Sequence, residues 1–226
     1  MRSIACSLPA ALLFAGLLLT ACGVVREARM TVPQALAAMP EERFGHPGWG
    51  RRGEFMLGEQ SVRYERGADR LSLFDTLSAG RAPLRYTLAG AAGAVQAECQ
   101  ANQVSVSAGV LAVDTRPWTL DCRWSGASDA TLRIGEGRVQ WGQQTREGSY
   151  RGHGQVLQLR SVHRLEGSRL PLASAVGYEL LQGERSVGSV DLSRGVPVLR
   201  RPDPRTPLGQ AVTEAALALA LVWEPA

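Results

Sequence analysis

The sequence predicts a mainly β protein, a single closed antiparallel barrel of about ten to twelve strands with a buried apolar helix at its C-terminal end. From Glu54 onward, stretches of about five to eight residues with strand-like alternation are separated by turn residues. The chain then ends on a segment that is apolar on every side, and such a helix must be enclosed by protein. A sheet can enclose a helix by closing into a barrel, so both observations lead to one architecture.

The first 21 residues have the layout of a secretory signal peptide. Arg2 precedes a short apolar stretch, and every residue from Ala10 to Leu19 is apolar or glycine. As a helix this stretch would extend about 15 Å, half the thickness of a bilayer core. It is too short for a permanent membrane span and indicates export.

The end of this segment, Leu19-Thr20-Ala21-Cys22, resembles the lipobox of bacterial lipoproteins. The resemblance implies that residues 1–21 are removed and that Cys22 is lipidated at its sulfur and then acylated at its amine. Several acyl chains give a stable anchor. Gly23 stands where such lipoproteins have Asp for retention in the inner membrane, which implies the periplasmic face of the outer membrane. The alternative is an ordinary cleaved signal peptide in which Cys22 bears no lipid.

The charge composition and the predicted export limit the classes of molecule that we expect this protein to bind. Removing residues 1–21 takes away Arg2 alone among the charged residues, which leaves 24 of the 25 basic residues against 21 acidic ones. This excess is mild, and export past the cytoplasm argues against nucleic acid as a partner. The sequence has no lysine, and we interpret its all-arginine basic content as a genome-wide compositional bias rather than as selection for arginine chemistry.

Residues 22–52 are predicted to form a lipidated tether with a short helix. In "TVPQALAAMPEER" we expect the helix to be capped by Thr31 and to tolerate Pro33 in its first turn, and the glycine-rich "FGHPGWGRRGE" ends it. Residues 53–226 then form the barrel domain. Within it, "ATLRIGEGRVQW" predicts a hairpin that turns at 135–137, and "VGYELLQGERSVGSVDL" one that turns near Gly183.

Two cysteines, Cys99 and Cys122, lie in the predicted barrel. In "AVQAECQ" Cys99 shares a face with the apolar residues, and in "WTLDCRW" Cys122 shares a face with Trp118 and Trp124. Both thiols should therefore face the core, and an oxidising periplasm favours a disulfide between them. It would close a loop of about 24 residues and contribute about 3 kcal/mol. Two separate buried thiols are the alternative.

The closing segment is predicted to be a helix that starts at Thr206 with Pro207. Nine residues without a polar side chain follow Glu214, and their alanines and leucines favour helix. They would extend about 13.5 Å, much less than the about 30 Å of a bilayer core. The segment therefore belongs inside the barrel and not in a membrane.

The order of a β-rich body, the late hairpin "GYELLQGERSVGSVDL" and a terminal apolar helix resembles the tubby C-terminal-like superfamily, which includes the LURP-one-related proteins. The resemblance extends from Ser149 to Trp223 and reaches the earlier strands by their number. It implies a twelve-stranded closed barrel around a central C-terminal helix. Eukaryotic tubby proteins bind phosphoinositide head groups through basic residues, but those positions have no match here and none is assigned.

The residue pattern predicts no catalytic site, no metal site and no cofactor, so we expect a protein that is not an enzyme. His46 and His153 fall in expected turns and His163 in an expected strand, and no pair has the spacing of a zinc site. We interpret all three as solvated side chains. The sequence also lacks a G-x-S-x-G elbow and a Walker-type phosphate loop.

Five arginines are candidates for contact with an anion, because guanidinium groups bind phosphate in a bidentate manner. Arg51 and Arg52 flank the glycine-rich loop, and Arg200, Arg201 and Arg205 cluster before the terminal helix. Lipid phosphates or acidic envelope polymers are the matching partners. The alternative is that both clusters are solvated loops.

Four tryptophans could line a ligand groove, but we expect packing for those that fall on the core face of strands. They are Trp49, Trp118, Trp124 and Trp141.

Two functions from different classes fit these expectations. The first is a non-enzymatic binding or scaffolding lipoprotein that presents a rigid, helix-filled barrel to an envelope protein or polymer. The second is a lipid or lipoprotein carrier in which an open half-barrel holds acyl chains. The first is preferred, because a filled barrel leaves no interior cavity for a substrate.

Overall fold

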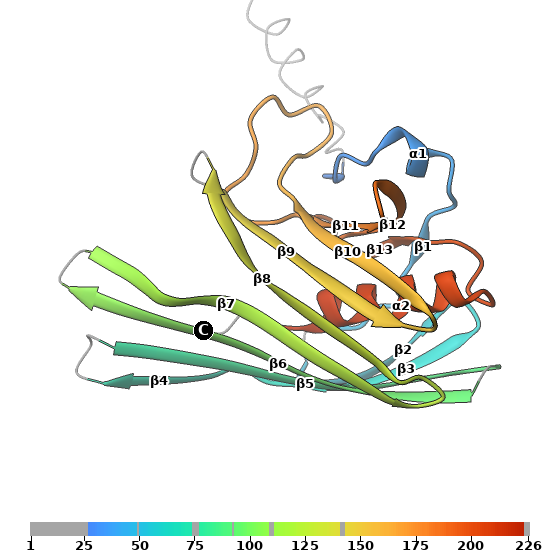
Figure 1. The fold of residues 1–226 in the computed structure, drawn as a ribbon, viewed down its shortest axis with the longest axis horizontal. Helices are drawn as coiled ribbons and strands as arrows, with labels where there is room; N and C mark the ends of the chain where they lie inside the picture. The colour runs from blue at the N-terminus through green and yellow to red at the C-terminus, as the bar shows by residue number, and fades with distance from the viewer. Residues whose placement is uncertain are drawn as a thin grey trace, which may run out of the picture.

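The computed structural model describes residues 27–48, 50–73, 77–91, 93–108, 111–140 and 143–223. Within these ranges, thirteen strands form one sheet that curls around a helix (Figure 1). Every pairing is antiparallel, and twelve strands follow the path β1-β13-β12-β11-β10-β9-β8-β7-β6-β5-β3-β2, with β4 paired to β5. The predicted mainly β barrel with a C-terminal helix is therefore confirmed.

The elements, in chain order, are α1 (Gln34–Ala37), β1 (Glu42–Arg43), β2 (Arg52–Leu57), β3 (Gln60–Arg66), β4 (Asp69–Leu73), β5 (Leu77–Gly90), β6 (Gly93–Ala108), β7 (Leu111–Gly126), β8 (Ala130–Gln140), β9 (Gln143–Gly152), β10 (Gln155–Val162), β11 (Gly177–Gln182), β12 (Arg185–Asp191), β13 (Val198–Arg200) and α2 (Pro207–Leu221).

The barrel is nearly closed, and the residues after β1 bridge its two edge strands. Gly45 N donates to Met56 O in β2 over 2.8 Å, and the rings of Phe44 and Phe55 stack with their centroids 5.4 Å apart. A Cβ on Gly45 would lie 2.7 Å from Met56 O, so only glycine permits this approach. These contacts join the segment after β1 to β2, the strand at the other edge of the sheet.

The N-terminal helix is shorter than predicted and starts differently. Pro33 is its N-cap residue and makes no side-chain cap, so the prediction of a Thr31 cap is wrong. Thr31 N instead donates to Arg164 O over 2.9 Å, beside a bridge between Met30 and Leu165. This pairing fixes Thr31 in the extended backbone that leads to the helix. Residues 30–44 thus pack on the barrel, with Met30 and Leu36 buried.

The predicted disulfide is present at the centre of the long strands. Cys99 in β6 and Cys122 in β7 are directly opposite in register, and their sulfur atoms are bonded. Both side chains are buried on the core face, as the alternation of their strands predicts. The bond joins neighbouring strands whose register is already set by the sheet.

One predicted hairpin is wrong and one is confirmed. Strand β8 runs without a turn through residues 135–137, and its register with β9 shifts after Glu136. Gly135 and Gly137 keep φ angles outside the left-handed region that a tight hairpin needs, so these glycines accompany a bulge instead of a turn. The β11–β12 hairpin does turn at Gly183, whose φ is 63°.

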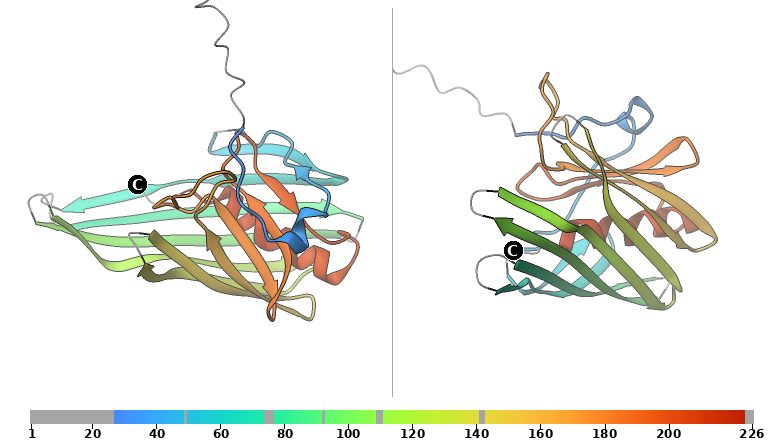
Figure 2. Two further views of the ribbon diagram at one scale, coloured as in Figure 1. Left: turned by 90° about the horizontal axis from the view of Figure 1, so that it is seen from above. Right: turned by 60° about the vertical axis from the view of Figure 1, so that its left-hand side comes forward.

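Helix α2 lies inside the curled sheet, as predicted (Figure 2). Thr206 is its N-cap and accepts from Gly209 N over 3.1 Å, with Pro207 in the first turn. Gly188 of β12 allows close approach, since a Cβ there would lie 2.6 Å from Val212 Cγ1. None of the helices in the described ranges has the length and apolar character that crossing a membrane requires.

Candidate functional site

Helix α2 contains one buried carboxylate, which is hydrogen-bonded by a side chain of β9 and by side chains of the β7–β8 and β9–β10 connections. Glu214 is 1% exposed. Its Oε2 accepts from Tyr150 Oη over 2.7 Å and from Ser128 Oγ over 3.1 Å, and its Oε1 lies 2.8 Å from His153 Nε2. A buried carboxylate is tolerated only with such partners, so this network fixes the helix within the sheet.

A second layer of the network holds the backbone of the same residue. Tyr86 Oη donates to Glu214 O over 2.8 Å and accepts from Trp124 Nε1 over 2.8 Å. Burial, and next the charge of Glu214, raise the pKa of Tyr86 and of Tyr150. Both phenols therefore stay protonated and donate hydrogen bonds to Glu214. This arrangement holds α2 in place and indicates a structural role.

Two histidines are not the solvated side chains that the sequence predicts. His153 lies against Glu214 with 14% of its side chain exposed, and His163 is buried between Ser161 Oγ (2.9 Å from Nε2) and Leu172 O (3.1 Å from Nδ1). His46 is exposed. Within the described ranges, no group of three or more His, Cys, Asp or Glu side chains could hold a metal ion.

The arginines predicted to contact an anion separate into buried and exposed groups. Arg200 bonds to Glu41, and Arg201 Nη2 lies 2.7 Å from Glu42 Oε2, with 10% and 4% of their side chains exposed. These ion pairs connect the end of β13 to the residues around β1. The two guanidinium groups therefore stabilise the fold. Arg205 is 78% exposed and lies 3.5 Å from Glu59.

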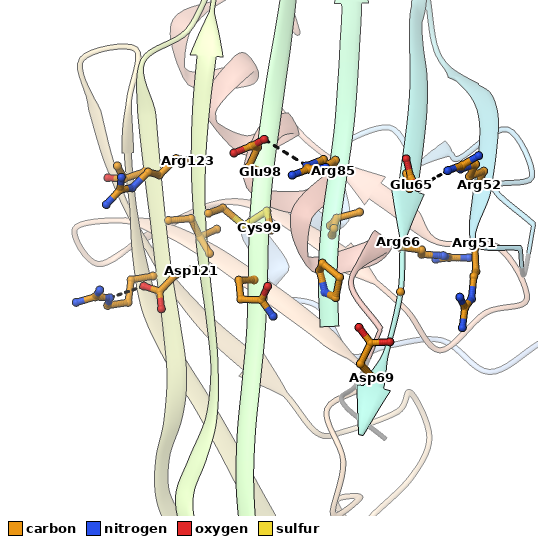
Figure 3. A pocket seen from close by; sticks show the side chains of 18 of the residues that line it. Arg51, Arg52, Glu65, Arg66, Asp69, Arg85, Glu98, Cys99, Asp121 and Arg123 are labelled. Carbon is orange, nitrogen blue, oxygen red and sulfur yellow. Dashed lines mark hydrogen bonds and ion pairs between the residues drawn. A yellow bond between two sulfur atoms is a disulfide. The ribbon is translucent and has the colours of Figure 1, made fainter. Parts of the chain in front are cut away.

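Arg51 and Arg52 lie at one end of a charged row on the outer surface (Figure 3). The row crosses seven strands in continuous register, from β2 to β9, with the β4 strand outside it. We call it the ladder face, and its members are Arg52, Glu65, Arg85, Glu98, Arg123, Thr131 and Arg151. With strands about 4.8 Å apart, it is about 29 Å long.

The ladder face lies in a groove with an excess of positive charge. The groove has a volume of about 1340 Å³ and is lined by seven arginines and four carboxylates. Arg52 pairs with Glu65 at 2.6 Å and Arg85 with Glu98 at 3.3 Å, all well exposed. Exposed pairs contribute only about 0–1 kcal/mol, so an incoming anion can compete for these arginines.

Three exposed arginines of the groove are not held by such pairs. In the part of the chain that the structure describes, Arg51, Arg123 and Arg151 have no carboxylate within ion-pair distance. Arg51 lies just before β2, whereas Arg123 and Arg151 point outward from β7 and β9. They are spread along the groove, which suits an extended anionic ligand better than a small ion.

The sequence predicts part of this site. The alternation of "WTLDCRW" places Arg123 on the outer face, but the register that aligns it with Arg85 and Arg151 depends on partner strands. Trp118 and Trp124 are buried, so packing is confirmed for them. Trp49, Trp141 and Cys22 lie outside the described residues.

Comparison of the chain with protein families, with curated proteins and with solved structures finds no match. The lipobox and the resemblance to the tubby C-terminal-like superfamily therefore stay predictions.

Proposed function

We propose that the protein is a lipid-anchored, non-enzymatic binding module at the periplasmic face of the outer membrane, and that its ladder face binds an anionic envelope polymer. The ladder face is the observation that supports this proposal. It is long, exposed and basic, and its arginines present planar donor groups that match phosphate and carboxylate oxygens.

The interior of the barrel favours binding over catalysis. Helix α2 is buried along most of its length. The carboxylate of Glu214 is hydrogen-bonded to Tyr150, Ser128 and His153. A chemical reaction needs groups that can reach a substrate, whereas these groups are bonded to one another. The exposed side chains of the ladder face are accessible without any change in the fold.

The position of the expected anchor favours a polymer over the lipid head groups of the same membrane. The first described residues and α1 pack beside β12, and the ladder face is centred on β6, half-way round the barrel (Figure 1). An anchor at Cys22 is only a few residues before this segment. The ladder face would therefore point away from the anchoring membrane.

Binding to immobilised polyphosphate at increasing salt concentration tests the proposal on the full chain. We expect the triple variant Arg51→Gln, Arg123→Gln, Arg151→Gln to bind at least about tenfold more weakly. Each removed phosphate contact should also make the dependence of log affinity on log salt shallower by about one. The three side chains are exposed, so the free energy of unfolding should be unchanged within about 0.5 kcal/mol.

A matched control removes three exposed arginines outside the groove, Arg164, Arg169 and Arg185, also as glutamines. This variant has the same net charge as the first and should bind like the unsubstituted chain. Equal weakening in both variants would mean that net charge alone drives binding. That result, or an unsubstituted chain that does not bind, would refute the proposed role of the ladder face.

A further inference from the structure

A second cavity lies where α2 ends, and Arg66 lines both this cavity and the groove of the ladder face. It has a volume of about 760 Å³ and opens between the last turn of α2 and the segment that follows β12. Its apolar wall includes Leu219, Val222, Leu192 and Val196. Cavities of about 300–1,000 Å³ with apolar walls and a few polar groups are typical small-molecule sites, and barrel mouths are a common place for them. We call it the mouth cavity.

Arg66, which also lines this cavity, differs from the other buried arginines. Four arginines in the described ranges are only 6–8% exposed: Arg66, Arg194, Arg200 and Arg201. The last three each pair with a carboxylate from Glu41 or Glu42. Arg66 has no carboxylate partner among the described residues. Because buried charges in proteins are usually paired, this guanidinium is an incomplete site.

Arg66 is held in place by groups that do not neutralise its charge. Its Nε donates to Gly50 O over 3.2 Å, its Nη1 to Leu221 O over 3.2 Å, and its Nη2 to Gly48 O over 2.8 Å. Its guanidinium carbon also lies 4.8 Å from the ring centroids of Tyr64 and of Trp223. These bonds use three of the five N–H groups of the side chain and leave two for a ligand.

Burial lowers the pKa of Arg66. The contact with Leu221 O gives Arg66 a structural role as well, because a cation at the C-terminal end of a helix interacts favourably with its dipole. That role accounts for the position of the side chain. It does not account for the cavity beside it, nor for the absence of a carboxylate within ion-pair distance of Arg66 among the described residues.

We propose that the mouth cavity binds a single-chain amphiphile with an anionic head group. The carboxylate or phosphate of the ligand bonds to Arg66, and its chain lies along the apolar end of α2. This differs from an open half-barrel carrier, because α2 is buried inside the sheet along most of its length and the cavity lies at the end of the helix. The ladder face plays no part in it.

The test counts bound ligand by native mass spectrometry of the full chain. Dodecanoate, dodecyl phosphate and dodecanol share one chain length and differ in the head group. We expect one molecule of dodecanoate or of dodecyl phosphate per chain, and the comparison of the two identifies the preferred head group. Dodecanol should bind at least about tenfold more weakly, as for the loss of one charge-assisted hydrogen bond.

Variants separate binding from folding. Arg66→Gln should bind the anions no better than dodecanol, but it also removes a contact to α2. Ala220→Phe leaves Arg66 intact and fills the cavity that Ala220 lines, so it should abolish binding of all three molecules. The control Ala173→Phe adds the same ring at an exposed position outside the cavity and should bind normally. The triple ladder-face variant should also bind normally.

Three outcomes would overturn the proposal. The first is equal binding of dodecanol and dodecanoate, and the second is normal binding by Ala220→Phe. The third involves Glu224, which follows Trp223 in the sequence. If the unsubstituted chain binds none of the three molecules and Glu224→Gln binds dodecanoate, a carboxylate of the chain itself is the partner of Arg66.

Discussion

Glu214 is the residue whose environment departs most from its sequence context. It stands directly before nine residues without a polar side chain, yet it is buried with them. Three side chains satisfy it, Tyr150 from β9 and Ser128 and His153 from the connections between strands. This carboxylate thus helps to hold α2 in position within the barrel, together with the bonds from Tyr86 to Glu214 O and from Arg66 to Leu221 O.

Replacing Glu214 with Gln should destabilise the protein strongly. The amide keeps the size of the side chain but puts an N–H₂ group against donors, so one or more of them loses its acceptor. We expect the free energy of unfolding to fall by about 2–4 kcal/mol in urea denaturation. The control Glu184→Gln changes an exposed carboxylate and should have no measurable effect. A loss below about 1 kcal/mol for Glu214→Gln would show that water replaces the network easily.

At the scale of elements, α2 and the strands depend on each other. The helix has few polar groups that could make it stable in water, and its apolar surface is covered by strands from both halves of the barrel. Short helices are marginal in isolation and take their stability from packing. The sheet in turn has no other element that could fill its interior within the described ranges.

Deletion of residues 214–226 should therefore prevent folding. The truncated chain would lose Glu214 and the apolar face that fills the barrel, and we expect no cooperative thermal transition by circular dichroism. Leu217→Met serves as the control, since a volume-conserving change in the core usually costs less than about 1.5 kcal/mol. A truncated chain that melts cooperatively would support the open half-barrel carrier instead.

At the scale of the whole molecule, one cluster of charges ties the N-terminal segment to the barrel. Glu41 accepts from Arg194 at 2.8 and 3.0 Å and also bonds to Arg200, and Asp191 lies 3.0 Å from Arg194. The hydrogen bonds from Arg194, and then the charges of Arg194 and Arg200, lower the pKa of Glu41, although burial partly opposes them. The cluster joins residues about 150 positions apart.

This cluster should make stability depend on pH in the acid range. A carboxyl whose pKa is lowered by folding stabilises the protein above its unfolded pKa of about 4.3, and that contribution is lost as pH falls through the folded pKa. Urea denaturation between about pH 7 and pH 3 should therefore show a steeper loss for the unsubstituted chain than for Glu41→Gln. Glu59→Gln, at an exposed glutamate, is the control. Parallel pH profiles for Glu41→Gln and the unsubstituted chain would contradict this prediction.

The sequence by itself determined the local properties of the chain. Period-two alternation assigned Cys99 and Cys122 to the core face, Thr206 and Pro207 marked the start of α2, and the apolar run after Glu214 required an enclosing sheet. These follow from backbone periodicity and from capping, which act over a few residues. The same reasoning from local sequence wrongly predicted a turn at Gly135. Pairing of β8 with β7 on one side and β9 on the other keeps the strand extended there, through a bulge.

Only the tertiary structure decided which distant side chains meet. Strand register aligned Arg52 with Arg151 across seven strands, and closure of the barrel brought His153 to Glu214. It also left Arg66 without a carboxylate partner among the residues that the structure describes. Each result depends on contacts between residues that are far apart in sequence, and a local pattern contains no information about the partner. The candidate binding surfaces of this protein depend on strand order and register, because these determine which side chains are neighbours on the outer and inner faces of the sheet.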